Sequence, residues 1–387
     1  MSFVKFDQEI KNKIDLNSVP KLVVAFYHCW YGTPSGPRGK WEHWNHPVFD
    51  NATPKQKQIL ASMNELRFKL NRGEILEAEF AEKIKILQKE GEKVIPVHDP
   101  EKIIGPEERR DIGAAHYPLI GLYDSTDPDL LKYHIKLAES AGVDVLAFNW
   151  WGQGDITDVS LKTFCEVAEE INTRVKATAL IDGYCWHGGY PLRKSIEMFS
   201  YFLENYRDRK SFLHLKDLPV IMFYQARVYS PDQWRNIRLE LRRKGLDGVF
   251  LGGECFEDQY SPVFEGIQYY SPLSVRPFSE NRLREEYARS AMICKNNGLI
   301  VGLAVMPGYD DRQVRFPGTV VARRNGECYH MTWRVAMEQN PNWIMICSWN
   351  EWHEGSEIEP SVEYGDYYIR LTREYADKFK GLLKLKS

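Results

Sequence analysis

Two carboxylates, Glu351 and Glu354, stand three residues apart among tryptophans and a histidine, directly after an apolar run. That run, residues 343–347, is typical of a buried strand, so both acids are expected at its carboxyl end. Acidic side chains are rarely buried unless they are paired or functional. Two like charges in an aromatic pocket raise the pKa of at least one of them, which lets one site hold a general acid beside a base. We therefore predict acid–base catalysis by this pair, in preference to two solvated carboxylates on a first helical turn.

The composition is that of an ordinary globular protein, with 43% hydrophobic and 27% charged residues in a chain of 387. The net charge of -3 provides no basic excess for binding nucleic acid or an anionic membrane. The sequence has neither an 18-residue apolar run nor the apolar core of a signal peptide at its start. Its 7 scattered cysteines, never in C-x-x-C spacing, argue against a disulfide framework or a zinc ribbon. We expect a cytoplasmic, reduced protein without nucleic-acid or membrane partners.

Short apolar runs alternate with segments of helical pattern along the chain. The runs are residues 22–27, 143–150, 175–181, 220–224, 248–252, 266–270, 300–306 and 343–348. Helices are predicted at residues 129–140, 195–205, 231–244, 281–296, 332–339 and 367–383, and the fifth-to-sixth connection is expected to hold no full helix. The alternation predicts an α/β fold, a (β/α)8 TIM barrel that forms one catalytic domain over residues 1–387. A doubly wound sheet is the second choice, but no G-x-G-x-x-G motif follows any strand.

Residues 50–112 interrupt this alternation between the first strand and its expected helix. Two stretches rich in Glu, Lys and Leu, residues 55–73 and 75–93, predict a helical hairpin inserted in the first βα loop. Loops at that end of a barrel overlook its active site. We expect the insertion to border the site, either as a solvated appendage or as a lid or an oligomer contact.

Active sites of such barrels form at the carboxyl ends of the strands, so the residues there are the binding candidates. Aromatic rings suit the C–H faces of sugars, and aromatic residues make up 13% of this chain. The candidate substrate-binding residues are Tyr27, Tyr31, Trp41, His43, Trp150, Trp151, Asp182, Tyr184, Tyr224, Tyr229, Tyr309, Asp310, Trp349, Asn350 and His353. Asp310 is equally suited to capping a turn. Together these residues predict a sugar-sized cleft with a carboxylate pair at its floor.

Three histidines near the predicted cleft are the candidate metal ligands. They are His43, His46 and His353. The spacing His43-x-x-His46 lacks a third ligand in helical phase, and Pro47 follows at once. We therefore expect hydrogen-bonding or core histidines and no metal or other cofactor. No G-x-S-x-G nucleophile elbow is present, and Cys347 suits a small buried position better than nucleophilic attack.

Several segments, in order along nearly the whole chain, match the motifs of one enzyme family. They are FYHCWYG at 26–32, GKWEHW at 39–44, GLYDSTDP at 121–128, AGVDVL at 141–146, NWWG at 149–152, PGYDDR at 307–312, and WNEWHEG at 349–355 followed by IEP at 358–360. On these segments the sequence resembles the endo-α-mannosidase family of glycosidases, glycoside hydrolase family 99. The WNEWHEG element with IEP is specific to it, and NWWG is moderately so.

The resemblance implies a (β/α)8 barrel, metal-free catalysis, an oligosaccharide partner, and internal cleavage of α-mannosides with retention. It also implies a substrate-assisted mechanism without an enzyme nucleophile. The position matching Glu351 takes the proton of the sugar 2-hydroxyl, which attacks the anomeric carbon, and the position matching Glu354 protonates the leaving oxygen and later activates water. The chain departs from the family pattern at Asp182, where the family carries Glu, and in the insertion after Trp44. A shorter carboxylate shifts a sugar contact by roughly one C–C bond, which affects sugar preference.

Two other functional classes remain open on the sequence. A glycan-binding or glycosyl-transferring protein on the same scaffold is the first, because a fold does not determine a function. A metal hydrolase that uses His43 and His46 is the second and weaker one. Sugar binding without turnover would favour the binding protein, and activity that survives chelation would dismiss the metal hydrolase.

Overall fold

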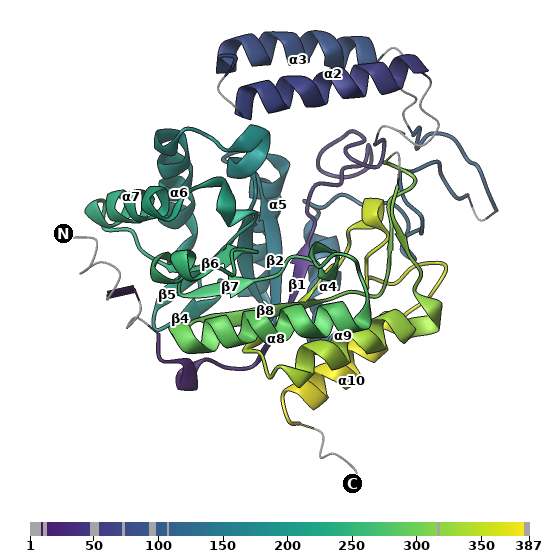
Figure 1. The fold of residues 1–387 in the computed structure, drawn as a ribbon. Helices are drawn as coiled ribbons and strands as arrows, with labels where there is room; N and C mark the ends of the chain where they lie inside the picture. Colours follow the sequence, from purple (N-terminus) through teal and green to yellow (C-terminus); the bar gives the residue numbers. More distant parts are fainter. Residues whose placement is uncertain are drawn as a thin grey trace.

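A closed parallel barrel forms the centre of the protein (Figure 1). The computed structural model describes residues 9–10, 14–46, 54–71, 74–92, 98–106, 108–315 and 318–382. The barrel strands in this described part are β1 (Leu22–Tyr27), β2 (Val145–Trp150), β3 (Lys176–Ile181), β5 (Leu218–Phe223), β6 (Val249–Gly253), β7 (Gly266–Gln268), β8 (Ile300–Val305) and β11 (Trp343–Ile346). Each pairs in parallel with the next, and β11 closes the ring on β1. The predicted (β/α)8 barrel is confirmed.

Helices on the outside of the barrel connect most successive strands (Figure 1). They are α4 (Pro128–Ala141), α5 (Ile156–Glu170), α6 (Leu192–Tyr206), α7 (Pro231–Arg243), α8 (Glu280–Asn297), α9 (Glu327–Glu338) and α10 (Tyr367–Phe379). As expected, β6 and β7 are joined through a short 3-10 turn, η4 (Asp258–Val263). Short strands β4 (His214–Leu215), β9 (Tyr309–Asp310) and β10 (Val320–Val321) lie outside the ring of eight. No helix in the described ranges is both long and apolar enough to cross a bilayer.

Local sequence signals explain where several helices begin and end. Gly142 and Gly298 end α4 and α8 in the left-handed conformation, with φ of 70° and 68°, which costs glycine no Cβ clash. Helix α5, which the sequence pattern did not single out, begins after Asp155, whose side chain accepts a hydrogen bond from the backbone N–H of Thr157. Helix α10 ends at Phe379, and residues 383–387 lie outside the described residues.

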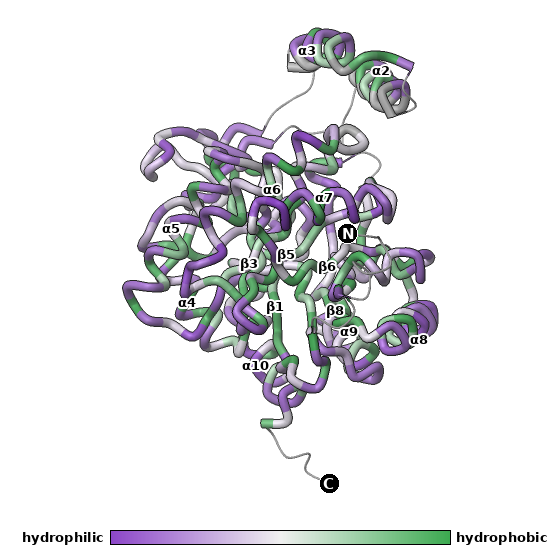
Figure 2. The backbone as a smooth tube through the Cα atoms, turned by 90° about the vertical axis from the view of Figure 1, so that its left-hand side faces the viewer, coloured by the Kyte–Doolittle hydropathy of each residue, from purple (hydrophilic) through white to green (hydrophobic). Residues whose placement is uncertain are grey.

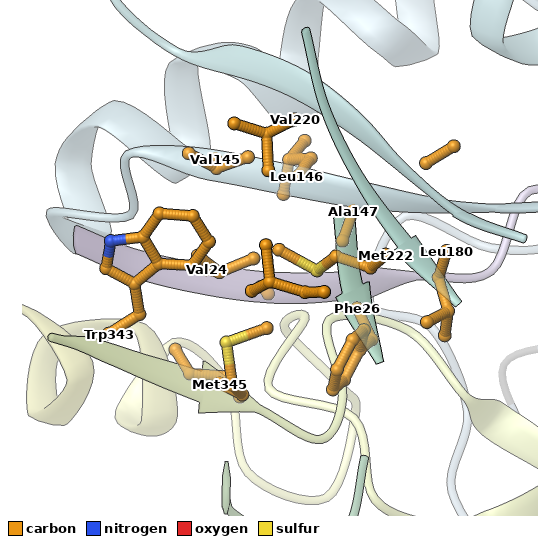
Figure 3. Packing of buried hydrophobic residues seen from close by; sticks show 14 of the residues in the cluster. Val24, Phe26, Val145, Leu146, Ala147, Leu180, Val220, Met222, Trp343 and Met345 are labelled. Carbon is orange, nitrogen blue, oxygen red and sulfur yellow. The ribbon is translucent and has the colours of Figure 1, made fainter. Parts of the chain in front are cut away.

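Apolar side chains from neighbouring strands fill the barrel. Val24, Met222, Trp343 and Met345 are fully buried, and Figure 3 shows them pointing toward one another from β1, β5 and β11. The residues of central strands such as β1 are mostly hydrophobic, whereas many residues of outer helices such as α8 are hydrophilic (Figure 2). Burial of apolar area at about 25 cal/mol per Å² makes this core the main source of stability and a rigid base for the strand ends.

An antiparallel pair of helices, α2 (Pro54–Asn71) and α3 (Glu77–Glu92), stands apart from the barrel (Figure 1). The two helices pack against each other, and α2 also lies close to the 3-10 segment η2 (Gly183–Gly188) that follows β3. The hairpin is therefore on the side of the barrel where the strands end. Within the predicted insertion, residues 50–53, 72–73, 93–97 and 107 lie outside the described residues.

Candidate active site

The loop after β11 carries both candidate catalytic carboxylates. Glu351 precedes the 3-10 turn η7 (Trp352–Glu354), and its side chain accepts a hydrogen bond from the backbone N–H of His353 at 3.1 Å. Ser348 Oγ accepts from the backbone N–H of Glu351 at 2.7 Å, while the backbone N–H of Ser348 donates to Ser356 O at 2.8 Å. The loop thus folds back on itself and keeps both carboxylates at the carboxyl end of the barrel.

A buried polar network fastens this loop to β1. Asn350 Oδ1 accepts from the backbone N–H of His28 at 2.7 Å, and Asn350 Nδ2 donates to His28 O at 3.0 Å. Asn350 Nδ2 also lies 3.1 Å from the Tyr123 hydroxyl, which donates to Glu359 Oε2 at 2.8 Å. Glu359 Oε1 lies 3.1 Å from His134 Nε2. A buried polar network whose groups are hydrogen-bonded favours a single arrangement of its side chains. The hydrogen bonds of Asn350 therefore fix the position of the neighbouring residue, Glu351.

Glu351 lies in a closed, weakly solvated environment. It is 3% exposed, with His28 Nε2 3.3 Å from Oε2 and His353 Nδ1 3.4 Å from Oε1. Burial, reinforced by the neighbouring charge of Glu354, raises the pKa of Glu351 well above its ordinary value, and Arg315 opposes that rise. Burial also lowers the pKa of His28 to about 3 and that of His353 well below its usual range. Both rings are therefore neutral at working pH.

Glu354 has a different environment, more open and beside a cation. Arg315 Nη1 donates to Glu354 Oε1 at 2.9 Å, to Asp311 Oδ2 at 2.8 Å and to the Tyr309 hydroxyl at 2.6 Å. The Arg315 side chain is 51% exposed, against 15% for Glu354. Two adjacent carboxylates in unlike surroundings are the arrangement that gives them separate acid and base roles.

Two cavities meet at Glu354. The smaller, about 290 Å³, contains both carboxylates; the larger, about 1450 Å³, extends along the loops after β7 and β8. Tyr224, Tyr270, Arg315 and Glu354 line both. The remaining lining residues of the smaller cavity are His28, Trp30, His43, His46, Asn149, Asp182, Val314, Glu351 and His353. A pocket lined by both carboxylates that adjoins a larger cavity suits an extended polar ligand.

Asp182 forms part of the wall of the smaller cavity and accepts hydrogen bonds from two neutral side chains. Asn149 Nδ2 donates to Asp182 Oδ2 at 2.9 Å, and Trp151 Nε1 donates to the same oxygen at 3.2 Å. Burial raises the pKa of Asp182 from 3.8 to about 7, although these two hydrogen bonds favour the charged form. Asp182 is therefore a carboxyl group that titrates near neutrality.

Seven of the residues predicted from the sequence line the cavities. They are Glu351, Glu354, His43, Asp182, Tyr224, Tyr309 and His353. Stacking of Trp30 on His43, with ring centroids 5.2 Å apart, and on Trp151, at 5.0 Å, gives the smaller cavity an aromatic side. Among the described residues no group of three or more His, Cys, Asp or Glu is arranged to hold a metal ion.

The other predicted binding residues do not line either cavity, and their contact with a substrate stays a prediction. They are Tyr27, Tyr31, Trp41, Trp150, Trp151, Tyr184, Tyr229, Asp310, Trp349 and Asn350. Successive side chains of a strand point to opposite faces, so half of those at a strand end pack against helices. Trp150 thus packs on Phe202 of α6 and donates to Asp158 Oδ1 at 2.8 Å. Trp151 is connected to the smaller cavity only indirectly, because its Nε1 donates to Asp182, which lines that cavity.

Several of the remaining residues have equally clear structural roles. The Tyr27 hydroxyl lies 2.8 Å from His134 Nδ1, and the Tyr184 hydroxyl donates to Tyr224 O at 2.6 Å. Asp310 pairs with Arg312 at 2.7 Å outside both cavities, which is the turn role that the sequence left open. The cavity residues His28, Trp30, Asn149 and Tyr270 follow or end predicted strands and could have been selected by position. Arg315 carried no signal in the sequence, because it follows a strand by ten residues.

Comparisons with known proteins agree on one family. The model of glycosyl hydrolase family 99 matches residues 85–381 of this chain. Glycoprotein endo-alpha-1,2-mannosidases of Rattus norvegicus and Mus musculus are each 26% identical to it over 407 aligned positions, which cover 95% of this chain and 78% of each relative. The GH99 endo-alpha-mannosidase of Bacteroides thetaiotaomicron has the same fold, with a TM-score of 0.70 and 23% identity over 93% of this chain and 97% of that one. Since the family match spans most of the chain, the protein belongs to glycosyl hydrolase family 99 and is a glycosidase.

Proposed function

We propose that this glycosidase cleaves α-mannosides within a chain, with retention of configuration, and that Glu351 and Glu354 are its catalytic pair. The observation that carries the proposal is the position of both carboxylates in one cavity, one buried and the other beside a cation. The mannosidase relatives support the substrate class, because they are named for action on α-1,2-mannose linkages.

In the proposed first step, the Glu351 carboxylate takes the proton of the sugar 2-hydroxyl. Burial of Glu351 and the Arg315 contact of Glu354 favour the single proton of the pair on Glu351 in the free site, so the step starts from the form in which that proton lies on Glu354. The freed oxygen O2 attacks the anomeric carbon C1, and the bond from C1 to the leaving oxygen breaks. Glu354 gives its proton to that leaving oxygen, so the products are a 1,2-anhydro sugar and a free alcohol. The axial 2-hydroxyl of mannose lies anti to an α-linked leaving group, which suits this displacement.

The second step returns the pair to its starting state. A water molecule gives a proton to Glu354 and attacks C1 while the bond between C1 and O2 breaks. Oxygen O2 takes back the proton held by Glu351. Two inversions at C1 give net retention. The neutral ring of His28 can donate from Nε2 to Glu351 Oε2 at 3.3 Å and so hold the carboxylate. His353 donates from Nε2 to His43 O at 2.9 Å, so its Nδ1, 3.4 Å from Glu351 Oε1, can accept only from the protonated form of Glu351.

The two cavities support a division of the substrate at Glu354. Of the two cavities, Glu351 lines only the smaller one, so the sugar whose 2-hydroxyl reacts belongs there. Glu354 lines both cavities, so the departing oxygen belongs at their junction and the rest of the leaving group in the larger one. A cleft of about 1450 Å³ on the leaving-group side is consistent with endo action on a chain.

The test is turnover of defined mannose oligosaccharides, with product size and anomer read by NMR. We expect internal cleavage and an α-configured first product from the wild type. Glu354→Gln is expected to lower the rate by about 10²–10⁴ on an oligosaccharide and by less on an activated aryl mannoside, which needs little protonation. Glu338→Gln, which changes a surface residue paired with Arg284, is the matched control. Full activity of Glu354→Gln on the oligosaccharide would refute the assignment, and binding without turnover by the wild type would favour a binding protein.

A further inference from the structure

Two arginines of the larger cavity lack the carboxylate partner that other arginines of this protein have. Among the arginine side chains that the structure describes, an ion pair is absent only at Arg174, Arg276 and Arg324. Arg276 lies in the loop between β7 and α8, and Arg324 begins the 3-10 turn η6 (Arg324–Gly326) before α9. Both are exposed and both line the larger cavity. A cation without a partner on a cavity wall is available to a ligand of opposite charge.

The other charges of the larger cavity are mostly compensated. Arg315 contacts two carboxylates, and Arg334 Nη2 lies 2.6 Å from Glu280 Oε1. Of the carboxylates that line this cavity, only Glu327 has no ion pair with a described residue. Glu327 lies in the first turn of α9, where the helix dipole favours a negative charge. The described lining therefore keeps two free cations against one free carboxylate.

The backbone holds Arg324 in an uncommon conformation. Its φ is 47°, in the left-handed region that disfavours residues with a Cβ. The preceding residue, Arg323, keeps the segment in place, because its buried guanidinium donates to Gly355 O at 3.0 Å and to Glu357 O at 2.9 Å in the loop after β11. Arg324 is thus tied to the loop that carries both catalytic candidates. Conformations of this kind persist where the surrounding structure enforces them, and they are concentrated at binding sites.

We propose that Arg276 and Arg324 bind an anionic group, a carboxylate or a phosphate, carried by the saccharide in the larger cavity. The inference rests on the proposed function, which places the leaving group there, and it makes the substrate an acidic glycan in place of a neutral mannan. Guanidinium groups suit both anions, because their planar N–H donors match two oxygens at once. Of the two cavities, both arginines line only the larger one, so they act on recognition of the leaving group and not on proton transfer.

The experiment compares ligands that differ only in one charged group. Methyl glycosides of α-linked mannose chains, two to four sugars long, carry at C6 of the reducing-end sugar a hydroxyl, a carboxylate or a phosphate. Binding is measured calorimetrically with the Glu351→Gln protein, at low salt and about pH 7. Since Glu351 lines only the smaller cavity, this variant is expected to prevent turnover while the ion pair between Arg315 and Glu354 keeps both partners.

The measured quantity is the ratio of the dissociation constants of the neutral and the anionic ligand, which a general loss of binding does not change. For at least one chain length the ratio should favour the anionic ligand, by roughly five-fold for each arginine, because exposed ion pairs are modest in strength. Arg276→Gln and Arg324→Gln should each lower the ratio by that factor. Glu327→Gln, which removes a repelling carboxylate, should raise it. Arg174→Gln is the matched control, because Arg174 is an exposed arginine without an ion pair that lines neither cavity.

Thermal melts check that each variant is folded. A ratio near one at every chain length, or a preference that Arg276→Gln and Arg324→Gln both leave in place within about two-fold, would overturn the proposal. A preference that does not shrink in about 0.5 M salt would equally contradict ion pairing. A larger gain for phosphate than for carboxylate identifies a phosphorylated saccharide, and an equal or smaller gain identifies an acidic sugar.

Turnover of neutral mannose oligosaccharides by the wild type tests the proposed function separately. An anionic preference without any turnover would retain the anion site and remove the hydrolytic mechanism. Turnover with retention but no anionic preference would retain the mechanism and remove the anion site.

Discussion

Removal of Arg315 should move the pH dependence of the enzyme's activity to higher pH. This cation touches Glu354 at 2.9 Å and lowers the pKa of Glu351. The reactive form carries one proton on the carboxylate pair, so the two limbs of a bell-shaped profile report the two macroscopic pKa values of that pair. A nearby cation favours an ionised carboxylate, and Arg315 in this way holds the pKa of Glu351 down. Arg315→Met should therefore move the limb that reports Glu351 to higher pH.

The size of the shift follows from the exposure of the ion pair. Two unit charges at 4 Å interact by about 4 kcal/mol at an effective dielectric constant of about 20. Because the Arg315 side chain is 51% exposed, water screens it, and exposed pairs typically retain about 1 kcal/mol or less. One pKa unit corresponds to about 1.4 kcal/mol, so the expected displacement is about 0.7 pH unit.

The assay is kcat/KM against pH, from roughly pH 4 to 9, on a mannose oligosaccharide. Arg312→Met is the matched control, because Arg312 is 57% exposed and pairs with Asp310 outside both cavities. It should leave the limbs in place. High salt should shrink the difference between Arg315→Met and the wild type, since screening weakens the same interaction. A profile of Arg315→Met that stays fixed or moves to lower pH would refute the electrostatic reasoning.

Three further predictions concern stability and are read from thermal or denaturant unfolding. Arg238→Met removes the cation that lies 2.7 Å from the buried Glu265 carboxylate and should cost about 3–5 kcal/mol; an unchanged midpoint would contradict this. Gly253→Ala places a Cβ 2.5 Å from Phe223 O in the next strand, so overpacking should cost about 1–3 kcal/mol, and a neutral effect would show that β6 can shift freely. Asp182 holds a proton in the folded state up to about pH 7 that the unfolded chain releases near pH 3.8, so stability should fall as pH rises between these values. Asp182→Asn should flatten this dependence of stability on pH. An equal slope in both proteins would show that other groups cause it.

The barrel was predictable because its strands are short apolar runs with helices between them. The first predicted strand, residues 22–27, agrees with β1, and the glycine signals at 142 and 298 do end helices. Helix α5 was missed although Asp155 gives it a standard N-cap, and α9 begins at Glu327, five residues before its predicted start. Both differences are local, and tertiary packing rather than intrinsic propensity decides such boundaries.

The site was predictable only in part, since the sequence shows which residues follow a strand but not which way they point. Glu351 and Glu354 were found from their spacing and their aromatic neighbours. Trp150 and Tyr184 were chosen by the same reasoning, yet they point outward and pack against helices. Arg315 was missed because a loop returns it to the site, and that return depends on contacts with Tyr309 and Asp311 rather than on any local pattern.

The position of Glu354 at the junction of the two cavities bears on which molecules can complete the reaction. On the proposed mechanism, this carboxylate must deprotonate whatever attacks the strained three-membered ring, so the attacker enters from the side that the first product has just left. The larger cavity has room for more than a water molecule there. We expect a second saccharide in that space to compete with water as acceptor, so that at high sugar concentration the enzyme would join chains as well as shorten them.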